Sequence, residues 1–254
     1  MKGFIASEVR KLTSTVTTWV MTAIGLGLIA LGAGLSLLVP GAGIGEFQGT
    51  DVQVGYFVDQ IGSSSIIVLI VALLSMTTEF RHGTIGRTLQ ITPSRTRVLI
   101  GKLAAATIYA LGFLIAGLVL VAILLLIGGL VAGTAVQPGS ETLGAVWFGL
   151  VGLSLTAWFG VALGALIRSQ VVAITVTLVW LFVVEAAVGA FAPSVGQWMP
   201  FNALNAVFVS DEAAAAMGGM GPQLLAPLTG LSVFVGYTVV SAVAAVVLMR
   251  TRDV

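Results

Sequence analysis

Six long apolar stretches constrain this chain more than any other feature of its sequence. They cover residues 19–39, 61–78, 103–132, 145–167, 169–191 and 228–249. About 20 residues at a rise of 1.5 Å cross the hydrocarbon of a bilayer, and backbone polar groups cannot stay unpaired in lipid. We therefore expect an all-α integral membrane protein, with six transmembrane helices in one domain that comprises residues 1–254.

The composition excludes a water-soluble fold. Hydrophobic residues make up 58% of the chain and charged residues only 8%, against about 25% in a typical globular domain. The chain has no cysteine and a single histidine, His82, which excludes thiol chemistry and a His-rich metal site within one chain. We expect no metal site. We also expect the first span to remain in the mature chain, because its apolar run is longer than that of a cleaved signal peptide.

The distribution of basic residues predicts the orientation, because Lys and Arg accumulate on the cytoplasmic side of membrane proteins. With both termini inside, all 11 basic residues fall in cytoplasmic segments. The three opposite loops, residues 40–60, 133–144 and 193–227, contain none of them. These loops hold six of the ten acidic residues: Glu46, Asp51, Asp59, Glu141, Asp211 and Glu212. We therefore expect cytoplasmic N- and C-termini.

Residues 1–18 precede the first span and contain a helical apolar pattern. The apolar side chains on one helical face are Phe4, Ile5, Val9 and Leu12. We interpret this segment as an amphipathic helix that lies on the inner leaflet. A frayed basic tail is the alternative.

Residues 79–102 form the longest cytoplasmic segment, with five basic residues and one acidic residue. Ile85, Leu89 and Ile91 give a short apolar stripe that ends before Pro93. A short helix with one apolar face and basic flanks has the shape of a docking element. Ordinary positive-inside anchoring is the alternative, and it explains the charge but not the stripe.

The third apolar stretch is too long for a perpendicular span. Its 30 residues reach about 45 Å as a helix, so it tilts or projects into water. Thr92 suits a helix N-cap and Pro93 the first helical position. We expect one helix to run from Pro93 into the membrane.

Residues 193–227 face the outside, yet they are too apolar for a solvated loop. Phe201, Leu204 and Phe208 lie at positions i, i+3 and i+7, which predicts that part of the segment is helical. We expect a re-entrant or lid segment that enters the outer leaflet. A hydrophobic loop packed over the bundle is the alternative.

Glu185 is the one charged residue well inside a span. A charge near the middle of the membrane costs about 2.5–3.5 kcal/mol, so by default it marks a functional site. It is either protonated, exposed to a polar path, paired across a dimer, or near the outer boundary and solvated by residues 193–227. Further polar residues near the outer end suit caps or ligand contacts: Ser63, Ser64, Ser65, Asn202 and Asn205.

No catalytic or nucleotide-binding motif is present in the sequence. The stretch that ends in Gly101-Lys102 has Thr96 and Leu103 where a phosphate-binding loop needs Gly and Ser or Thr. We therefore expect a chain that is not an enzyme and that binds no cofactor itself.

Three segments of the chain resemble the ABC-2 type permeases, the membrane subunits of ATP-driven transporters. The first is Ser7-Glu-Val-Arg-Lys-Leu-Thr-Ser before span one. The second is Glu79-Phe-Arg-His-Gly-Thr-Ile, followed by Thr92-Pro-Ser-Arg and Lys102. The third is Trp198-Met-Pro-Phe between spans five and six. Together they extend the resemblance over nearly the whole chain.

The resemblance implies roles for particular residues. In that family, the stretch after span two is a coupling helix that docks into a separate ATPase subunit. The residues that this places at the contact are Glu79, Arg81, Gly83, Thr84 and Arg87. The outer segment would close the pathway toward the outside, with a translocation path or outer gate formed by Glu185, Trp198, Phe201 and Asn202.

The resemblance also implies the partners. ATP and Mg²⁺ would be bound by the partner ATPase, and six spans imply two permease chains, expected as a homodimer, with two ATPases. It implies export across the cell (plasma) membrane, with lipid but no nucleic acid as a further partner. A self-contained channel or ion-coupled carrier is the competing class, for which one intramembrane glutamate is thin support. A membrane scaffold without transport is the third class, and it leaves the docking segment unexplained.

Overall fold

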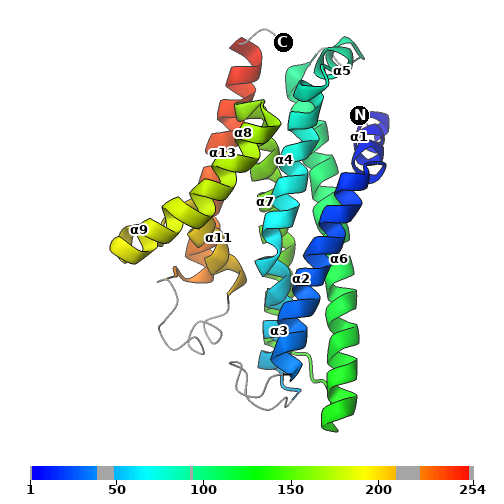
Figure 1. Cartoon of the computed structure of the whole chain (residues 1–254), viewed down its shortest axis with the longest axis vertical. Helices are drawn as coiled ribbons and strands as arrows, with labels where there is room; N and C mark the ends of the chain where they lie inside the picture. Colours follow the sequence, from blue (N-terminus) through cyan, green and yellow to red (C-terminus); the bar gives the residue numbers. More distant parts are fainter. Residues whose placement is uncertain (1, 39–48, 92–93, 210–223, 252–254) are drawn as a thin grey trace.

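The structure is a computed structural model and describes residues 2–38, 49–91, 94–209 and 224–251. These residues form helices joined by short connections, and no strand occurs among them (Figure 1). In chain order the helices are α1 Lys2–Thr13, α2 Val16–Leu38, α3 Asp51–Ser63, α4 Ser65–Arg81, α5 Ile85–Ile91, α6 Arg95–Ala132, α7 Ser140–Ile167, α8 Gln170–Val179, the π-helix η1 Trp180–Glu185, α9 Ala186–Phe191, α10 Pro193–Gly196, α11 Pro200–Phe208 and α13 Pro227–Thr251.

Six helical segments of the described chain are long and apolar enough to cross a membrane, which confirms the expected number of spans. They run over Val16–Leu35, Gln53–Arg81, Arg95–Ala132, Ser140–Ile167, Gln170–Phe191 and Pro227–Met249. Their length and composition are compatible with a multi-pass membrane protein.

The second span begins earlier than the sequence analysis expected. Residues 51–60, which we assigned to a loop, belong to α3, and α3 meets α4 at Ser64. Thr50 caps α3, because its side-chain oxygen accepts a hydrogen bond from the backbone N–H of Gln53 at 3.4 Å. The buried side chains of α3 recur at helical spacing: Val54, Phe57, Val58 and Ile61. The polar residues between them lower the apolar density of α3, which is why hydropathy alone missed it.

The third span extends beyond its apolar stretch as expected, but its helix begins at Arg95 and not at Pro93. The side-chain oxygen of Ser94 caps α6 by accepting from the backbone N–H of Arg97 at 3.4 Å. The expected cap, Thr92, and Pro93 lie outside the described residues. With 38 residues, α6 is about 57 Å long, well beyond the hydrocarbon thickness of a bilayer.

The two ends of the bundle differ in charge. We call the end formed by α1, α5, the start of α6 and the last turns of α13 the basic end (Figure 1). The Lys and Arg side chains that the structure describes all belong to segments at this end: Arg10, Lys11, Arg81, Arg87, Arg95, Arg97, Lys102 and Arg168. We call the end at which α3 and α7 begin the opposite end. Which end faces the cytoplasm stays a prediction.

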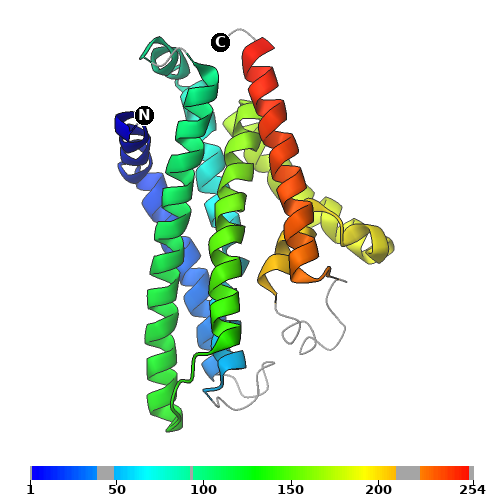
Figure 2. The same cartoon turned by 180° about the vertical axis from the view of Figure 1, so that it is seen from behind.

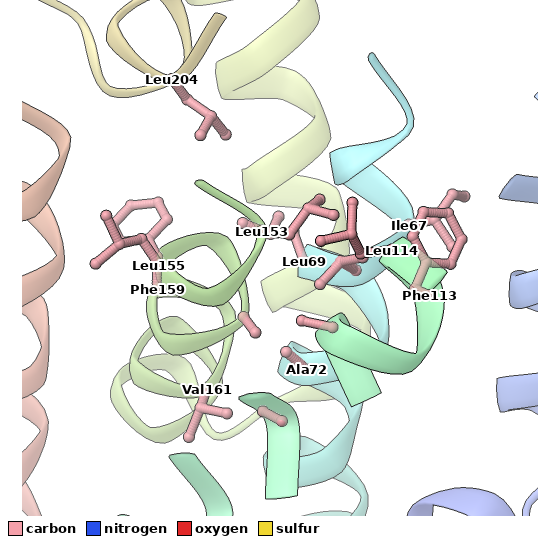
Figure 3. Packing of buried hydrophobic residues seen from close by; sticks show 14 of the residues in the cluster. Ile67, Leu69, Ala72, Phe113, Leu114, Leu153, Leu155, Phe159, Val161 and Leu204 are labelled. Carbon is pink, nitrogen blue, oxygen red and sulfur yellow. The ribbon is translucent and has the colours of Figure 1, made fainter. Parts of the chain in front are cut away.

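The core lies between α4 and α7, with α6 beside them (Figure 3). Two glycines of α7 allow the two backbones to approach closely. A Cβ atom on Gly160 would lie 2.5 Å from the carbonyl oxygen of Leu69, and one on Gly164 would lie 2.7 Å from that of Leu73. Small residues one helical turn apart are a common device for close helix packing in membranes.

Helix α1 packs against α6. Leu12 is buried with Val71 of α4 and Ala105 of α6, and a Cβ atom on Gly101 would overlap the ring of Phe4. The helix expected within residues 1–18 is therefore present over residues 2–13, with these apolar side chains turned toward the bundle. Its contact with the inner leaflet stays a prediction.

The fifth span diverges from the bundle. Helices α8, η1 and α9 extend sideways from it in both views (Figures 1 and 2). Within this span only Ala173, Thr177 and Glu185 are buried. Lipid or a second protein surface must cover the exposed apolar side chains of the span.

Helix α11 occupies part of the segment 193–227. Phe201, Leu204 and Phe208 are buried on it, which confirms the predicted helix. It packs against α13 and α7, and the ring of Phe208 fills the space over Gly62 and Gly152. Residues 210–223 lie outside the described part of the chain, and the depth of α11 in a bilayer stays a prediction.

Candidate functional site

Four charged side chains form a closed ring of ion pairs at the basic end. Lys102 Nζ lies 2.8 Å from Glu8 Oε2 and 2.9 Å from Glu79 Oε1. Lys11 Nζ lies 2.5 Å from Glu8 Oε1 and 2.9 Å from Glu79 Oε1. Each ammonium thus contacts both carboxylates. This charge ring (Glu8, Lys11, Glu79 and Lys102) joins α1 to α4 and α6 and has no formal net charge.

Three of the four side chains in the charge ring are buried. Lys102, Glu8 and Glu79 are 2%, 3% and 6% exposed. Lys102 also donates to the carbonyl oxygen of Ser75 at 3.0 Å, so that all three of its N–H donors are used. A buried ion pair is tolerated when hydrogen bonds satisfy its remaining donors, and removing one partner is strongly destabilising.

The ring also positions α5. Glu79 Oε2 accepts a hydrogen bond from the Thr88 hydroxyl at 3.5 Å, and the Glu79 carbonyl oxygen accepts from the Thr84 N–H at 3.0 Å. Gly83, with φ of +63°, allows the chain to turn between α4 and α5. Ile85 then buries its side chain at the first position of α5. Helix α5 is therefore tied to α4 directly and to α1 and α6 through Glu79.

The five residues predicted for the ATPase contact separate into two groups. Four of them are exposed: Arg81 at the end of α4, Gly83 and Thr84 in the connection to α5, and Arg87 on α5. Glu79 is instead buried in the charge ring. Arg81 also donates to Gln170 Oε1 of α8 at 3.1 Å. The structure thus leaves four of the five exposed near the α4–α5 connection and turns the carboxylate of the fifth inward.

A groove of about 500 Å³ opens beside the ring, between α1, the end of α4 and α5. The groove is lined by Lys11, Thr78, Glu79, His82, Thr84, Arg87 and Thr88. Partial burial opposes the charge of Lys11, but the hydrogen bonds and charges of Glu8 and Glu79 outweigh it and raise the pKa of Lys11. Lys11 therefore stays protonated at neutral pH and keeps the ring closed.

Glu185 lies at the last position of the π-helical turn η1 and is 2% exposed. Its Oε1 accepts from Trp180 Nε1 at 2.9 Å and from the Phe201 N–H at 3.0 Å, and its Oε2 accepts from the Asn202 N–H at 2.8 Å. Two of these donors are free N–H groups in the first turn of α11, where the helix dipole favours a negative charge. Glu185 is thus a helix cap supplied by another span.

Some of the residues predicted for an outer gate are in contact with one another. Phe201 is buried with its ring edge-to-face to Phe159, at a centroid distance of 6.1 Å, and Asn202 Nδ2 donates to the Gly196 carbonyl at 3.0 Å. Trp198 is 46% exposed, and its carbonyl accepts from the Tyr237 hydroxyl at 3.2 Å. The structure therefore brings Glu185 against Phe201 and Asn202 but not against Trp198.

A second carboxylate caps a helix at the opposite end. Asp51 Oδ1 accepts from the Gly139 N–H at 2.6 Å and from the Thr142 hydroxyl at 2.7 Å, and its Oδ2 accepts from the Glu141 N–H at 2.8 Å. These donors belong to the start of α7. A slight loss of solvation opposes the charge, but the hydrogen bonds outweigh it and lower the pKa of Asp51 to about 2.

Sequence reasoning missed Glu8, Asp51 and the pairing of Lys102. Lys102 lies between Gly101 and Leu103 near the edge of an apolar stretch, where a lysine needs an acidic partner. The position of Lys102 predicts that it has an acidic partner. It does not indicate which residue that is, because Glu8 is 94 positions away along the chain.

No protein-family model matches this chain, and a search of curated proteins finds no relative.

Proposed function

We propose that this chain is the membrane-spanning subunit of an ATP-driven transporter of the ABC-2 permease type, and that it acts in export. The observation that carries the proposal is α5, a short helix between the second and third spans. Its exposed residues include Arg87, and Glu79 ties it to three other helices. A docking helix needs such an arrangement, because it must present a surface and also transmit force.

The charge ring supplies the route for that force. An ATPase that binds α5 and changes shape with ATP would displace the α4–α5 connection. Glu79 would pass the displacement to α1 and α6, since Lys11 and Lys102 hold it from both sides. Such coupling requires a ligand that prefers one of two arrangements of the helices, and ATP on the partner subunit would provide this preference. In this proposal the basic end faces the cytoplasm.

The contact of Glu185 supports a coordinated outer gate. Glu185 fastens the fifth span to the first turn of α11, so these two elements would move together. Phe201 and Asn202 would then shift with the fifth span when the pathway opens. A second copy of the chain would complete the pathway and cover exposed apolar side chains of the fifth span.

The competing class, a channel or ion-coupled carrier, has less support. Such a protein needs an intramembrane ionisable group that is free to gate or to carry an ion. The carboxylate of Glu185 is already engaged by three N–H donors. A membrane scaffold without transport would not require a docking helix or a charge ring that links this helix to the spans.

Co-purification tests the proposal. The tagged chain is solubilised from its native host in mild detergent, beside an R81E/R87E variant and a control, Arg10→Glu, which reverses an exposed charge on α1. We expect a stoichiometric soluble ATPase with the wild type and the control and its loss from the double variant, with equal membrane insertion of all three. A wild-type preparation without any ATPase would contradict the proposal, and proton-dependent flux by the purified chain alone would favour a carrier.

A further inference from the structure

A cavity of about 200 Å³ lies away from the charge ring, where four parts of the chain meet. Ser63 and Ser65 border it from the junction of α3 and α4, and Thr156 from α7. Leu181 and Phe182 of η1 and Asn205 of α11 also border it. The side chains of Ser63, Phe182 and Asn205 are exposed, so the cavity opens to the surface of the chain on this side.

Three polar groups of the cavity form no hydrogen bond within the described part of the chain: the hydroxyls of Ser63 and Ser65 and the amide of Asn205. Ser65 is only 7% exposed, yet its hydroxyl forms no hydrogen bond with any part of the chain that the structure describes. The Asn205 amide, at the rim, likewise makes none within the described ranges. Thr156 differs, because its hydroxyl already donates to the Gly152 carbonyl at 2.7 Å. The Ser65 hydroxyl oxygen is itself accessible although the residue is mostly buried, so a molecule in the cavity can supply it with a hydrogen-bond partner.

The lining also limits the charge of an occupant. None of the residues that line the cavity is Asp, Glu, Lys, Arg or His. The nearby carboxylate of Glu185 is taken by three N–H donors and offers no free counter-charge. A charged molecule would lose its hydration without gaining an ion pair, which costs far more than burying a neutral polar group.

The size of the cavity limits the occupant further. An engineered cavity of about 150 Å³ in another protein holds benzene. A cavity of about 200 Å³ therefore suits a somewhat larger molecule than benzene. The apolar walls, which include Leu69, Leu181 and Phe201, suit a hydrocarbon body.

We propose that this cavity binds a small neutral molecule with an apolar body and one hydroxyl or carbonyl group. The polar group bonds to Ser65 and Asn205, and the hydrocarbon part lies against η1, α4 and α11. The inference does not depend on the proposed transport function, because it concerns binding to this chain alone.

Photolabelling tests the inference. The purified chain in lipid nanodiscs is exposed to an eight-carbon primary alcohol that carries an aliphatic diazirine, and the labelled residues are identified by mass spectrometry. We expect saturable labelling within residues 63–69, 181–182 and 201–205. Unlabelled 1-octanol should compete, whereas octyl sulfate and octyltrimethylammonium at equal membrane concentration should not.

Variants separate the cavity from the lipid-facing surface. Ser65→Leu fills the cavity and should reduce the site labelling at least about tenfold, whereas Ser65→Ala removes one hydrogen bond and should weaken apparent binding about fivefold. Asn205→Leu, at the exposed rim, gives a second test if Ser65→Leu does not fold. Ser232→Leu places the same side chain at an exposed position of α13 and should change nothing.

Three outcomes would overturn the inference. One is labelling spread evenly over α2 and α13 and unaffected by Ser65→Leu. Another is equal competition by the charged amphiphiles. The third is a co-purified lipid that blocks the site until it is removed, since that would make an acyl chain the occupant.

Discussion

Two regions of this bundle hold their carboxylates in different ways. At the basic end, Glu8 and Glu79 are paired with the ammonium groups of Lys11 and Lys102. Away from that end, Asp51 and Glu185 accept hydrogen bonds from backbone N–H groups that begin α7 and α11. The comparison shows how a one-sided distribution of cations changes the partners available to an acid.

The difference has a physical cause. The described Lys and Arg side chains all belong to segments at the basic end, so Asp51 and Glu185 have no nearby cation to pair with. Helix N-termini supply the substitute, because their free N–H groups carry a partial positive charge. At the basic end, cations instead bind carbonyl groups at the C-terminus of a helix. Arg168 donates to the Leu248 carbonyl at 3.3 Å, and Arg95 donates to the Met249 carbonyl. Both carbonyl groups lie in the last turns of α13.

The largest expected effect comes from breaking the charge ring. Lys102→Met leaves two buried carboxylates with only Lys11 as a partner and should destabilise the chain by about 3–5 kcal/mol. Thermal unfolding in detergent measures the loss. Arg10→Met removes an exposed cation of α1 and should change little. Equal stability of the two variants would show that the ring contributes nothing.

Glu185 should give the next largest effect. Glu185→Gln puts an NH₂ group against N–H donors, and the loss of charged hydrogen bonds should cost about 1.5–3 kcal/mol. Hydrogen exchange should accelerate in α11, over residues 201–208, and stay unchanged in α5. The control is Glu141→Gln, which neutralises an exposed acid. Unchanged exchange in α11 would refute its capping by Glu185.

Asp51 should give a smaller effect with a defined pH dependence. Asp51→Asn should speed exchange at residues 139–143, at the start of α7. Because the pKa of Asp51 is lowered to about 2, its stabilising effect is complete above the ordinary value of 3.8 and is lost as the pH falls toward 2. The pKa of Lys11 is raised, so the stability that protonated Lys11 contributes to the folded chain is lost only in strong alkali.

Because Asp51 is ionised at every pH well above 3.8, its stabilising effect should not depend on pH near neutrality. After correction for intrinsic exchange, protection of residues 139–143 should not change between about pH 5 and pH 9. A decline within that range would mean that Asp51 does not hold α7 as described.

The smallest expected effect is the coupling between the charge ring and the cap that Glu185 forms on α11. Lys102→Met and Glu185→Gln share no contact, so their effects on stability should add within about 0.5 kcal/mol. A double-mutant cycle of thermal stability measures this. A clearly larger coupling would mean that the two regions form one unit.

Hydropathy predicted most of the fold but not the contacts that organise it. The apolar runs predicted six spans because each is long enough to cross a bilayer as a helix. Helix α3 was missed because Asp51, Gln53 and Asp59 lower the apolar density of its sequence. Phe201, Leu204 and Phe208 marked α11 by their spacing, and all three are buried on it.

The sites were harder to predict because their partners are distant along the chain. Glu185 was recognisable as a costly intramembrane charge, but its partners are backbone N–H groups, which no side-chain pattern reveals. Glu79 was assigned to a docking surface on resemblance, whereas its carboxylate faces Lys102 and Lys11. The ATPase contact of Arg81, Gly83, Thr84 and Arg87 stays a prediction.

Site-specific crosslinking in intact cells tests the docking role of α5 most directly. A photo-crosslinking amino acid replaces Arg87, and a control replaces Trp147, which is exposed on α7. We predict a covalent adduct between position 87 and a soluble ATPase, and none from position 147. An absence of any ATPase adduct from position 87, with the variant present in the membrane at wild-type levels, would contradict a transporter subunit that couples through α5.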